Sequence, residues 1–356
     1  MEMSRAQQGE KGFDAGGDRG YPSIDSFKAA RFPAMDFAAV VIGRNEGERL
    51  KRCLQQLSAV AAVVIYVDSG STDGSAQWVR GNGVDVVALD TSVPFTAARA
   101  RNAGFNHVRK IVPDLAYVQF VDGDCELVAG WGERAFSFLA SHSDVAAVCG
   151  RRRERYPNRS IYNWLCDREW DGPAGEVTAM GGDAMVRAPA LEAVGLYRED
   201  LIAGEEPELC VRLRAAGWRI WRLPDEMTLH DARMTRFSQW WRRAVRAGYA
   251  FAQGAHLHGA PPERHWVWES RRAWIWGIVL PLVCLAIGLL FPPWGWAASL
   301  IYPLQILRQT LRNRGSLKER ALLALFQMLA RFPEGFGQLK FTRDRLFGRQ
   351  TGLIEY

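Results

Sequence analysis

The sequence predicts an α/β protein with a mostly parallel sheet flanked by helices, followed by a C-terminal membrane hairpin and amphipathic helices. Short β-branched runs alternate with amphipathic stretches from Ala38 to Gly150, a pattern typical of a sheet with both faces covered. Residues 273–291 carry no charge. A helix of that length rises about 28 Å, close to the hydrocarbon thickness of a bilayer.

Five buried strands and four intervening helices are expected in the first part of the chain. The strands are predicted over residues 38–42, 62–67, 84–89, 116–121 and 145–150, and the helices over 46–58, 73–81, 97–109 and 130–141. Beyond them we expect a loop containing 181–186, a helix over 207–217, a short strand over 219–223 and a helix over 236–258. Ligands gather at the carboxyl ends of parallel strands, where Asp68 and Asp122 both fall.

The chain divides by composition into five regions. They are a polar, glycine-rich segment expected to be disordered (1–36), the α/β domain (37–235), an interfacial amphipathic region (236–272), a transmembrane or re-entrant hairpin (273–309) and a basic amphipathic tail (310–356). The six cysteines include no Cys-x-x-Cys pair. Neither a zinc site nor a disulfide framework is therefore expected, and a reduced, cytosolic setting fits best.

Basic residues are concentrated in two places, although the net charge is only +6. One cluster comprises Arg151, Arg152, Arg153 and Arg155, and the other precedes the apolar hairpin. Such patches attract nucleic acid, anionic lipid or phosphorylated substrates. Tryptophans and the hairpin beside the second cluster favour lipid, so a membrane is expected as a partner and nucleic acid is not.

Two carboxylates, Asp122 and Asp124, follow a predicted buried strand with one glycine between them. An Asp-Gly turn is the simplest interpretation. The functional interpretation is a divalent cation site, because hard oxygen ligands suit Mg²⁺ or Mn²⁺ that bridges substrate phosphates.

Three other polar groups have both a structural and a functional interpretation. Asp68 either belongs to an ordinary strand–turn–helix connection or accepts a hydrogen bond from a nucleoside. Arg101 and Asn102 lie either on a solvated helix face or near a bound phosphate. Glu205 and Glu206 precede Pro207, which is suited to the first helical turn. They either cap that helix or supply an ionised general base that the helix dipole stabilises.

Taken together, these motifs resemble the family 2 glycosyltransferases with the GT-A fold, over roughly residues 38–231. "VVIGRNEGERLKRCL" resembles the family's opening strand and Asn-Glu turn, "VDSGSTDGS" its nucleotide-binding stretch with Ser69 in place of an aspartate, and "ARNAG" its Ala-Arg-Asn-x-Gly element. "GGDAMVR" resembles the acceptor-side loop and "GEEPELCVRLRAAGWRI" the Glu-Asp motif, with Glu206 at the usual aspartate.

The resemblance implies a role for each matching residue. It implies donor binding by Gly43, Asn45, Glu46, Asp68, Ser69, Arg101 and Asn102; metal binding by Asp122, Asp124 and His230; catalysis by Glu206, with Glu205 as the second candidate; and acceptor contacts by Gly182, Asp183, Gln239 and Arg242. The implied cofactor is Mg²⁺ or Mn²⁺.

The implied reaction is inverting, metal-dependent transfer of a sugar from a nucleotide-sugar donor, expected to be a UDP-sugar. Arginines 151–153 and 155 can grip phosphate through bidentate hydrogen bonds. Together with the hairpin they predict a polyprenyl-linked or similar lipid phosphate acceptor, in bacterial polysaccharide or glycolipid biosynthesis. Basic residues flank both ends of the hairpin, which predicts the bacterial inner (cytoplasmic) membrane with the catalytic domain on the cytoplasmic face.

Three alternatives remain open from the sequence. "QWWRR" (239–243) has Arg243 where processive polysaccharide synthases of the family carry tryptophan, which favours single transfer over polymerisation. An NAD-dependent dehydrogenase would need a Gly-x-Gly-x-x-Gly run that "IGRNEGE" does not supply. A non-catalytic membrane-surface binding protein would leave the carboxylates unexplained.

Overall fold

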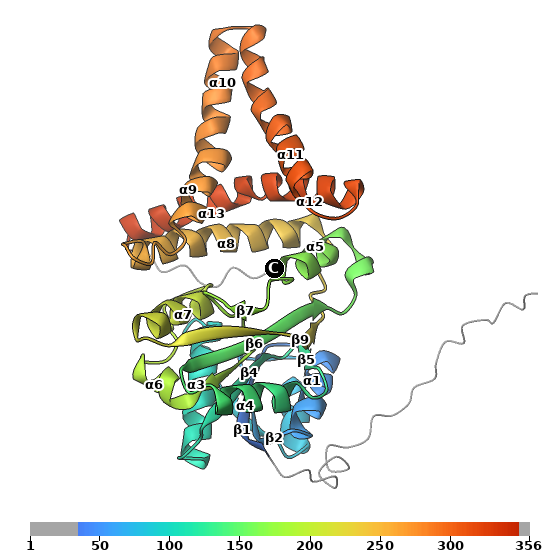
Figure 1. The fold of residues 1–356 in the computed structure, drawn as a ribbon, viewed down its shortest axis with the longest axis vertical. Coiled ribbons are helices and arrows are strands. Elements are labelled where there is room, and N and C mark those ends of the chain that lie inside the picture. Colours follow the sequence, from blue (N-terminus) through green and yellow to red (C-terminus); the bar gives the residue numbers. More distant parts are fainter. Residues whose placement is uncertain (1–34, 349–356) are drawn as a thin grey trace, which may run out of the picture.

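The structure is a computed structural model that describes residues 35–348. The predicted disordered segment lies almost wholly outside these residues, as does the end of the basic tail. Figure 1 shows three parts: an α/β domain, a layer of helices lying across it, and a helical hairpin that projects from that layer.

The sheet is mixed rather than mostly parallel, which corrects the prediction. Its order is β3-β2-β1-β4-β8-β6-β9-β5, with β7 paired to β9. The strands are β1 (Met35–Gly43), β2 (Ala61–Asp68), β3 (Asp85–Ala88), β4 (Tyr117–Asp122), β5 (Cys125–Leu127), β6 (Val145–Glu154), β7 (Gly175–Glu176), β8 (Ala184–Arg187) and β9 (Arg219–His230). Only β3-β2-β1-β4 and the β6–β9 pair run parallel.

Strand β8 makes the sheet mixed, since it lies antiparallel between β4 and β6. Its residues were predicted as loop because four residues after a pair of glycines carry little periodic signal. Ala184, Met185 and Val186 are nevertheless buried. The long-range pairing with β4 and β6 therefore decides the conformation of this segment.

Strand β9 extends beyond the predicted residues 219–223 to His230. The chain passes Pro224, which cannot donate a ladder hydrogen bond, and the register with β6 shifts between Cys149 and Arg151. Gly150 faces this bulge, where an added Cβ would lie 2.7 Å from the Asp225 carbonyl oxygen. Strand β9 ends with His230 paired to Cys125 of β5, directly after Asp124.

The four helices predicted between the first strands are confirmed with small changes at their ends. They are α1 (Glu48–Ser58), α2 (Ser75–Gly81), α3 (Ala97–Ile111) and α4 (Trp131–Ser141). Three more complete the domain: α5 (Ile161–Glu169), α6 (Ala188–Ala193) and α7 (Glu205–Ala215). Helix α3 packs on β1 and β2, where Phe105 and Val108 join a core that contains the fully buried Val40, Phe120 and Trp131.

The described part of the C-terminal region contains helices and connecting turns but no strand. It consists of α8 (Phe237–His258), α9 (Val267–Trp274), η3 (Ile275–Val279), α10 (Leu280–Leu290), η4 (Trp294–Leu300), α11 (Ile301–Arg312), α12 (Leu317–Leu329) and α13 (Arg331–Leu346). Residues 267–290 form one continuous helix of 24 residues, long and apolar enough to cross a membrane. Within the described residues it is the one helix that meets this test.

The backbones of helices α8 and α13 are in direct contact at two glycines. A Cβ added at Gly248 would overlap the Glu334 backbone, and one added at Gly337 would overlap the Val245 carbonyl. Glycine at these positions lets the two backbones touch, and Gln338 donates a hydrogen bond to the Gly248 carbonyl at 2.9 Å. The layer between the α/β domain and the hairpin is therefore a close-packed unit (Figure 1).

Candidate active site

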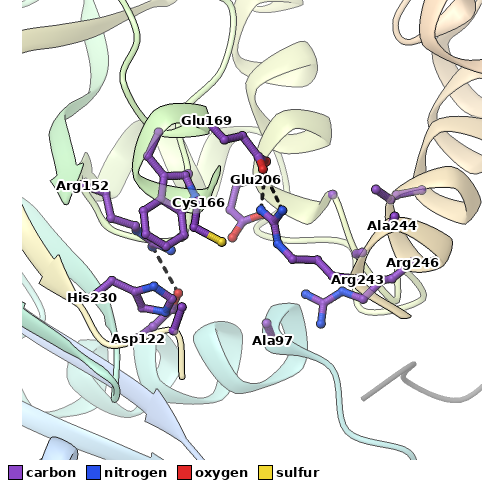
Figure 2. A pocket seen from close by; sticks show the side chains of 18 of the residues that line it. Ala97, Asp122, Arg152, Cys166, Glu169, Glu206, His230, Arg243, Ala244 and Arg246 are labelled. Atoms are coloured by element: carbon purple, nitrogen blue, oxygen red, sulfur yellow. Dashed lines mark hydrogen bonds and ion pairs between the residues drawn. The ribbon is translucent and has the colours of Figure 1, made fainter. Parts of the chain in front are cut away.

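A cavity of about 930 Å³ opens at the carboxyl ends of β1 and β4 and continues to helices α8, α12 and α13. Figure 2 shows part of it, with Asp122 and His230 on one side and Arg243 and Arg246 of α8 on the other. The predicted site residues that line it are Gly43, Glu46, Ser69, Arg101, Asp122, Asp124, Arg152, Gly182, Glu205, Glu206 and His230. The structure thus brings residues from eight separated sequence segments into one cavity.

Arg101 of α3 holds three of the carboxylates together. Its Nη1 lies 2.8 Å from Glu205 Oε1, and its Nη2 lies 2.9 Å from Asp122 Oδ1 and 3.1 Å from Glu206 Oε1. The Arg101 side chain is only 2% exposed. Burial alone would lower its pKa, but the three carboxylates raise that pKa above its ordinary value. Arg101 therefore stays charged and fixes the start of α7 against the end of β4.

Asp122 is held from its other side by Arg152 and Asp183. Arg152 Nη2 lies 3.2 Å from Asp122 Oδ2 and 2.9 Å from Asp183 Oδ2. Asp183 accepts hydrogen bonds from the Asp122 backbone N–H at 3.0 Å and the Thr228 hydroxyl at 2.7 Å. Because Asp183 is fully buried, its geometry favours positioning Asp122 over the predicted contact with an acceptor.

Gly182 fits between these charged groups because it has no side chain. An added Cβ would lie 2.7 Å from both Arg101 Nη2 and Asp122 Oδ2. Glycine at this position thus lets the backbone that leads into β8 contact the Arg101–Asp122 ion pair. This is a steric requirement that the sequence pattern alone did not reveal.

The second carboxylate of the pair, Asp124, faces His230. Asp124 Oδ2 lies 3.0 Å from His230 Nε2 and 3.7 Å from Arg49 Nη1. Burial would raise the pKa of Asp124, but His230 and Arg49 bring it below the ordinary value. Burial would likewise lower the pKa of His230, and Asp124 raises it overall. The indole of Trp170 packs edge-on against His230 with ring centroids 4.8 Å apart.

Two carboxyl groups in the cavity, those of Glu206 and Glu46, have pKa values well above the ordinary value. Burial, with Glu205 as the next cause, raises the pKa of Glu206 to about 7 against the opposing effect of Arg101. Burial and the nearby Asp124 raise the pKa of Glu46 to about 7, with Arg49 opposing. A carboxyl group with a pKa near 7 is suited to general acid–base chemistry at neutral pH.

Comparison with known proteins shows the family to which this α/β domain belongs. Residues 39–173 match the family model described as glycosyl transferase family 2. The chain carries a family 2 glycosyltransferase domain. The protein is therefore a transferase enzyme, which sets aside both the dehydrogenase and the non-catalytic binding protein considered from the sequence.

Similar proteins come from archaea and bacteria. The glycosyltransferase AglE of Haloferax volcanii is 26% identical over 215 residues, which cover 56% of this chain and 68% of AglE. The succinoglycan biosynthesis protein ExoA of Rhizobium meliloti is 25% identical over 192 residues, which cover 50% of this chain and 57% of ExoA.

A solved structure extends the likeness to nearly the whole chain. It is that of the mannosyltransferase PcManGT from Pyrobaculum calidifontis in complex with GDP-Man and Mn²⁺. It has a TM-score of 0.53 and 20% identity, and the match covers 91% of this chain and 93% of PcManGT. The family 2 glycosyltransferase thus has the GT-A fold that the sequence predicted.

Several predicted donor residues of the glycosyltransferase lie beside the cavity rather than on its wall. Asp68 accepts hydrogen bonds from the Gly70 and Ser71 backbones at 3.1 and 3.0 Å. Asn45 accepts one from the Thr72 backbone at 2.8 Å. Asn102 donates to the Tyr197 carbonyl at 2.9 Å. These contacts shape the loops around the cavity, and the predicted donor roles of these residues stay predictions.

Three of the four arginines in the cluster at 151–155 form ion pairs with carboxylates outside the cavity, and the fourth, Arg152, pairs with Asp122. Arg151 lies 3.3 Å from Asp171, Arg153 lies 3.3 Å from Asp167, and Arg155 pairs with Glu126. Arg151 and Arg153 do not line the cavity. The geometry therefore gives this cluster carboxylate partners instead of the predicted acceptor phosphate, and Arg152 alone of the four faces the cavity.

The residues of the motif at 239–243 also lie in different places, some in the main cavity and some outside it. Gln239 caps α8, where its Oε1 accepts from the Thr235 and Arg236 backbones at 2.9 and 3.0 Å. Arg242 lines a separate basic pocket. Only Trp240 and Arg243 of this motif line the main cavity. The geometry does not favour the predicted acceptor contacts of Gln239 and Arg242.

The wall of the cavity formed by helix α5 was not predicted from the sequence. Glu169 makes two contacts with Arg243, at 2.7 and 2.8 Å (Figure 2). Cys166 and Trp170 line the same wall. Helix α5 has neither a motif nor a marked amphipathic pattern in its sequence, so only the fold brings it to the cavity.

Proposed function

We propose that this glycosyltransferase moves a sugar from a nucleotide-sugar donor to a lipid-linked acceptor at a membrane surface, with inversion at the anomeric carbon. The observation that carries the proposal is the single cavity that joins the carboxylates at the strand ends to the basic and apolar helices α8, α12 and α13. A donor bound at the strand ends and an acceptor bound along the helices would meet inside it.

Glu206 is the proposed general base. In the reaction, the acceptor hydroxyl oxygen bonds to the anomeric carbon while the bond from that carbon to the donor diphosphate breaks, and the hydroxyl proton passes to the base. Glu206 lines the cavity and has a pKa of about 7 because it is buried beside Glu205. Glu205 is less exposed and has a closer contact with Arg101, which favours Glu206.

A divalent cation is the proposed cofactor, and the residues present fit one. Ligand atoms of Asp124, Cys125 and His230 lie within 4.8 Å of one another, as do those of Asp122, Cys125 and Asp183. The carboxylates suit Mn²⁺ or Mg²⁺, an imidazole ligand favours Mn²⁺ of the two, and the buried thiol suits neither. Asp124 and His230 would hold the ion, with Asp122 beside them. When bound, it would neutralise charge that develops on the leaving diphosphate.

The acceptor is proposed to lie against α8. Arg243 and Arg246 face the cavity from one side of this helix (Figure 2), and Leu323 and Phe326 of α12 supply an apolar wall. This combination fits a lipid-linked phosphate better than a free sugar, because cationic and apolar groups occur together. It replaces the arginines of β6 as the main acceptor surface.

The hairpin is proposed to enter the inner membrane from the cytoplasmic side. Its helices expose apolar side chains, including Leu282, Leu289 and Leu304, while arginines stand at both of its cytoplasmic ends. Trp294 at the tip is 83% exposed. Trp294→Cys, combined with Cys284→Ser, would be probed with a membrane-impermeant thiol reagent. Labelling from outside indicates a full span, and protection indicates re-entry.

The test of function is direct transfer. Purified protein would be incubated with labelled nucleotide sugars, Mn²⁺ and membrane lipid extract, and product lipids would be separated. The proposal predicts one labelled lipid that is absent with Glu206→Gln. Labelling of a soluble, phosphate-free acceptor at the same rate would contradict the lipid-linked acceptor. A ladder of products would favour the processive synthase, which the placement of Gln239 outside the cavity argues against.

A further inference from the structure

A second cavity of about 550 Å³ lies at the base of the hairpin, outside the catalytic cavity. Its walls come from α9 and η3 on one leg, from α11 on the other, and from the junction of α12 and α13. In Figure 1 the two legs meet at the tip and diverge toward this base. This cavity has no role in the proposed transfer reaction.

Four arginines converge on the cavity: Arg272, Arg308, Arg312 and Arg331. Arg331 has a partner, Glu334, at 2.6 Å. Among the described residues, no carboxylate lies within 4.0 Å of the other three guanidinium groups. Burial, together with Arg272, holds the pKa of Arg331 below its ordinary range, although Glu334 opposes this. The cavity therefore has a surplus of positive charge.

Buried polar atoms around the cavity also lack partners. Within the described chain, the donor Arg272 Nε and the acceptor Gln309 Oε1 are buried and make no hydrogen bond, and of the two only the Arg272 N–H would be satisfied by an anionic ligand. Both residues line the cavity. Buried polar groups normally find a partner, and an unpaired one costs about 1–3 kcal/mol. A ligand with several acceptor oxygens would satisfy the guanidinium groups.

The surface that continues from the arginines is apolar. Ile275 lines the cavity and is 46% exposed. Leu304, Leu307 and Leu311 are exposed on α11 beside it. Trp268 and Trp276 also line the cavity, and amphipathic aromatic rings favour the level of lipid headgroups. Basic pockets between membrane helices on the cytoplasmic side suit anionic headgroups.

We propose that this cavity binds the phosphate headgroup of an anionic phospholipid, whose acyl chains run along the exposed apolar surfaces of the hairpin legs. The bound lipid would fill the wedge between the legs and hold the hairpin against the α12–α13 junction. Gln327 and Arg331 line both this cavity and the catalytic one, so lipid binding would also steady a wall of the catalytic cavity. The inference rests on the membrane insertion proposed above.

The test measures lipid retention by native mass spectrometry of the full chain in detergent, titrated with phosphatidylglycerol. The cavity variant carries Arg308→Gln and Arg312→Gln, which alter two exposed side chains. The control carries Arg271→Gln and Lys318→Gln, which remove the same charge from exposed residues outside the cavity. The single variant Arg308→Gln provides a second measurement if the double variant folds poorly.

The cavity variant should bind the lipid about thirtyfold more weakly, since each arginine near an anionic headgroup contributes roughly fivefold. The control should change by less than about threefold. Equal losses in the two variants would show general surface attraction and overturn the inference. Equal retention of phosphatidylcholine, or equally tight binding of glycerol phosphate, would also overturn it.

The two proposals fail in different ways. The lipid titration needs no sugar transfer, so retained lipid with no transfer would contradict the proposed function alone. Normal transfer with equal lipid binding by the cavity and control variants would contradict this inference alone.

Discussion

Replacing Arg101 by leucine tests the central electrostatic feature of the site. The change leaves Glu205, Glu206 and Asp122 facing one another without the cation that now lies within 3.1 Å of each. Removing one member of a buried ion pair costs about 3–5 kcal/mol, because the remaining charge stays buried. For a domain of roughly 200 residues this corresponds to a fall in Tm of roughly 6–20 °C.

A matched control lies on the same helix. Arg109 of α3 pairs with Glu192 at 2.7 Å, but the two side chains are 27% and 39% exposed. Exposed pairs contribute about 0–1 kcal/mol, so Arg109→Leu should change the Tm by only a few degrees. The assay is thermal unfolding of both variants and the parent protein in the same detergent.

The stability loss of Arg101→Leu should also depend on pH. Burial already raises the pKa of Glu206 to about 7, with Arg101 opposing, so the variant should raise it further. A carboxyl group whose folded-state pKa is raised contributes stability below its unfolded pKa and loses it as pH rises. The deficit should therefore be larger at pH 8 than at pH 5. Equal Tm values for Arg101→Leu and Arg109→Leu at pH 8 would refute the reasoning.

Other predictions concern the reaction itself. Glu206→Gln should retain donor binding, measured by a rise in Tm with added nucleotide, but lose roughly 10²–10⁴-fold in kcat; near-normal kcat would exclude it as the base. With the parent enzyme, log kcat should rise with pH and level off above about 7, the pKa of Glu206; a flat profile from pH 5.5 to 8 would contradict this role. Gly182→Ala places a Cβ 2.7 Å from Arg101 and Asp122 and should lower transfer at least about tenfold, whereas alanine at Gly181, where an added Cβ meets nothing within 4 Å, should have little effect. His230→Ala should raise the Mn²⁺ concentration needed for half-maximal transfer by at least about tenfold, the smallest loss typical of even an outer-shell partner of a metal ligand; an unchanged requirement would remove His230 from the cation site.

Features that depend on local pattern could be predicted from the amino-acid sequence. Alternating apolar runs located β1, β2 and β4 and the helices between them, because side-chain periodicity reports which face of an element is buried. The same reasoning located Asp122 at a strand end and Glu205 and Glu206 at a helix start. The uncharged run 273–291 likewise marked the hairpin, since length and composition alone decide whether a helix can span a bilayer.

The pairing of charged side chains could not be predicted, because it depends on how distant segments fold together. Arg101 and Glu205 are 104 residues apart in the chain and 2.8 Å apart in space, and no local pattern specifies such a pairing. Strand alternation separates Arg152 from Arg151 and Arg153 of β6, but only the fold shows that Arg152 faces the cavity while the other two pair with carboxylates beside it. Insertion of β8 between β4 and β6 is equally non-local. Ion pairing and strand order depend on contacts across the whole domain, whereas periodicity reports only burial along one element.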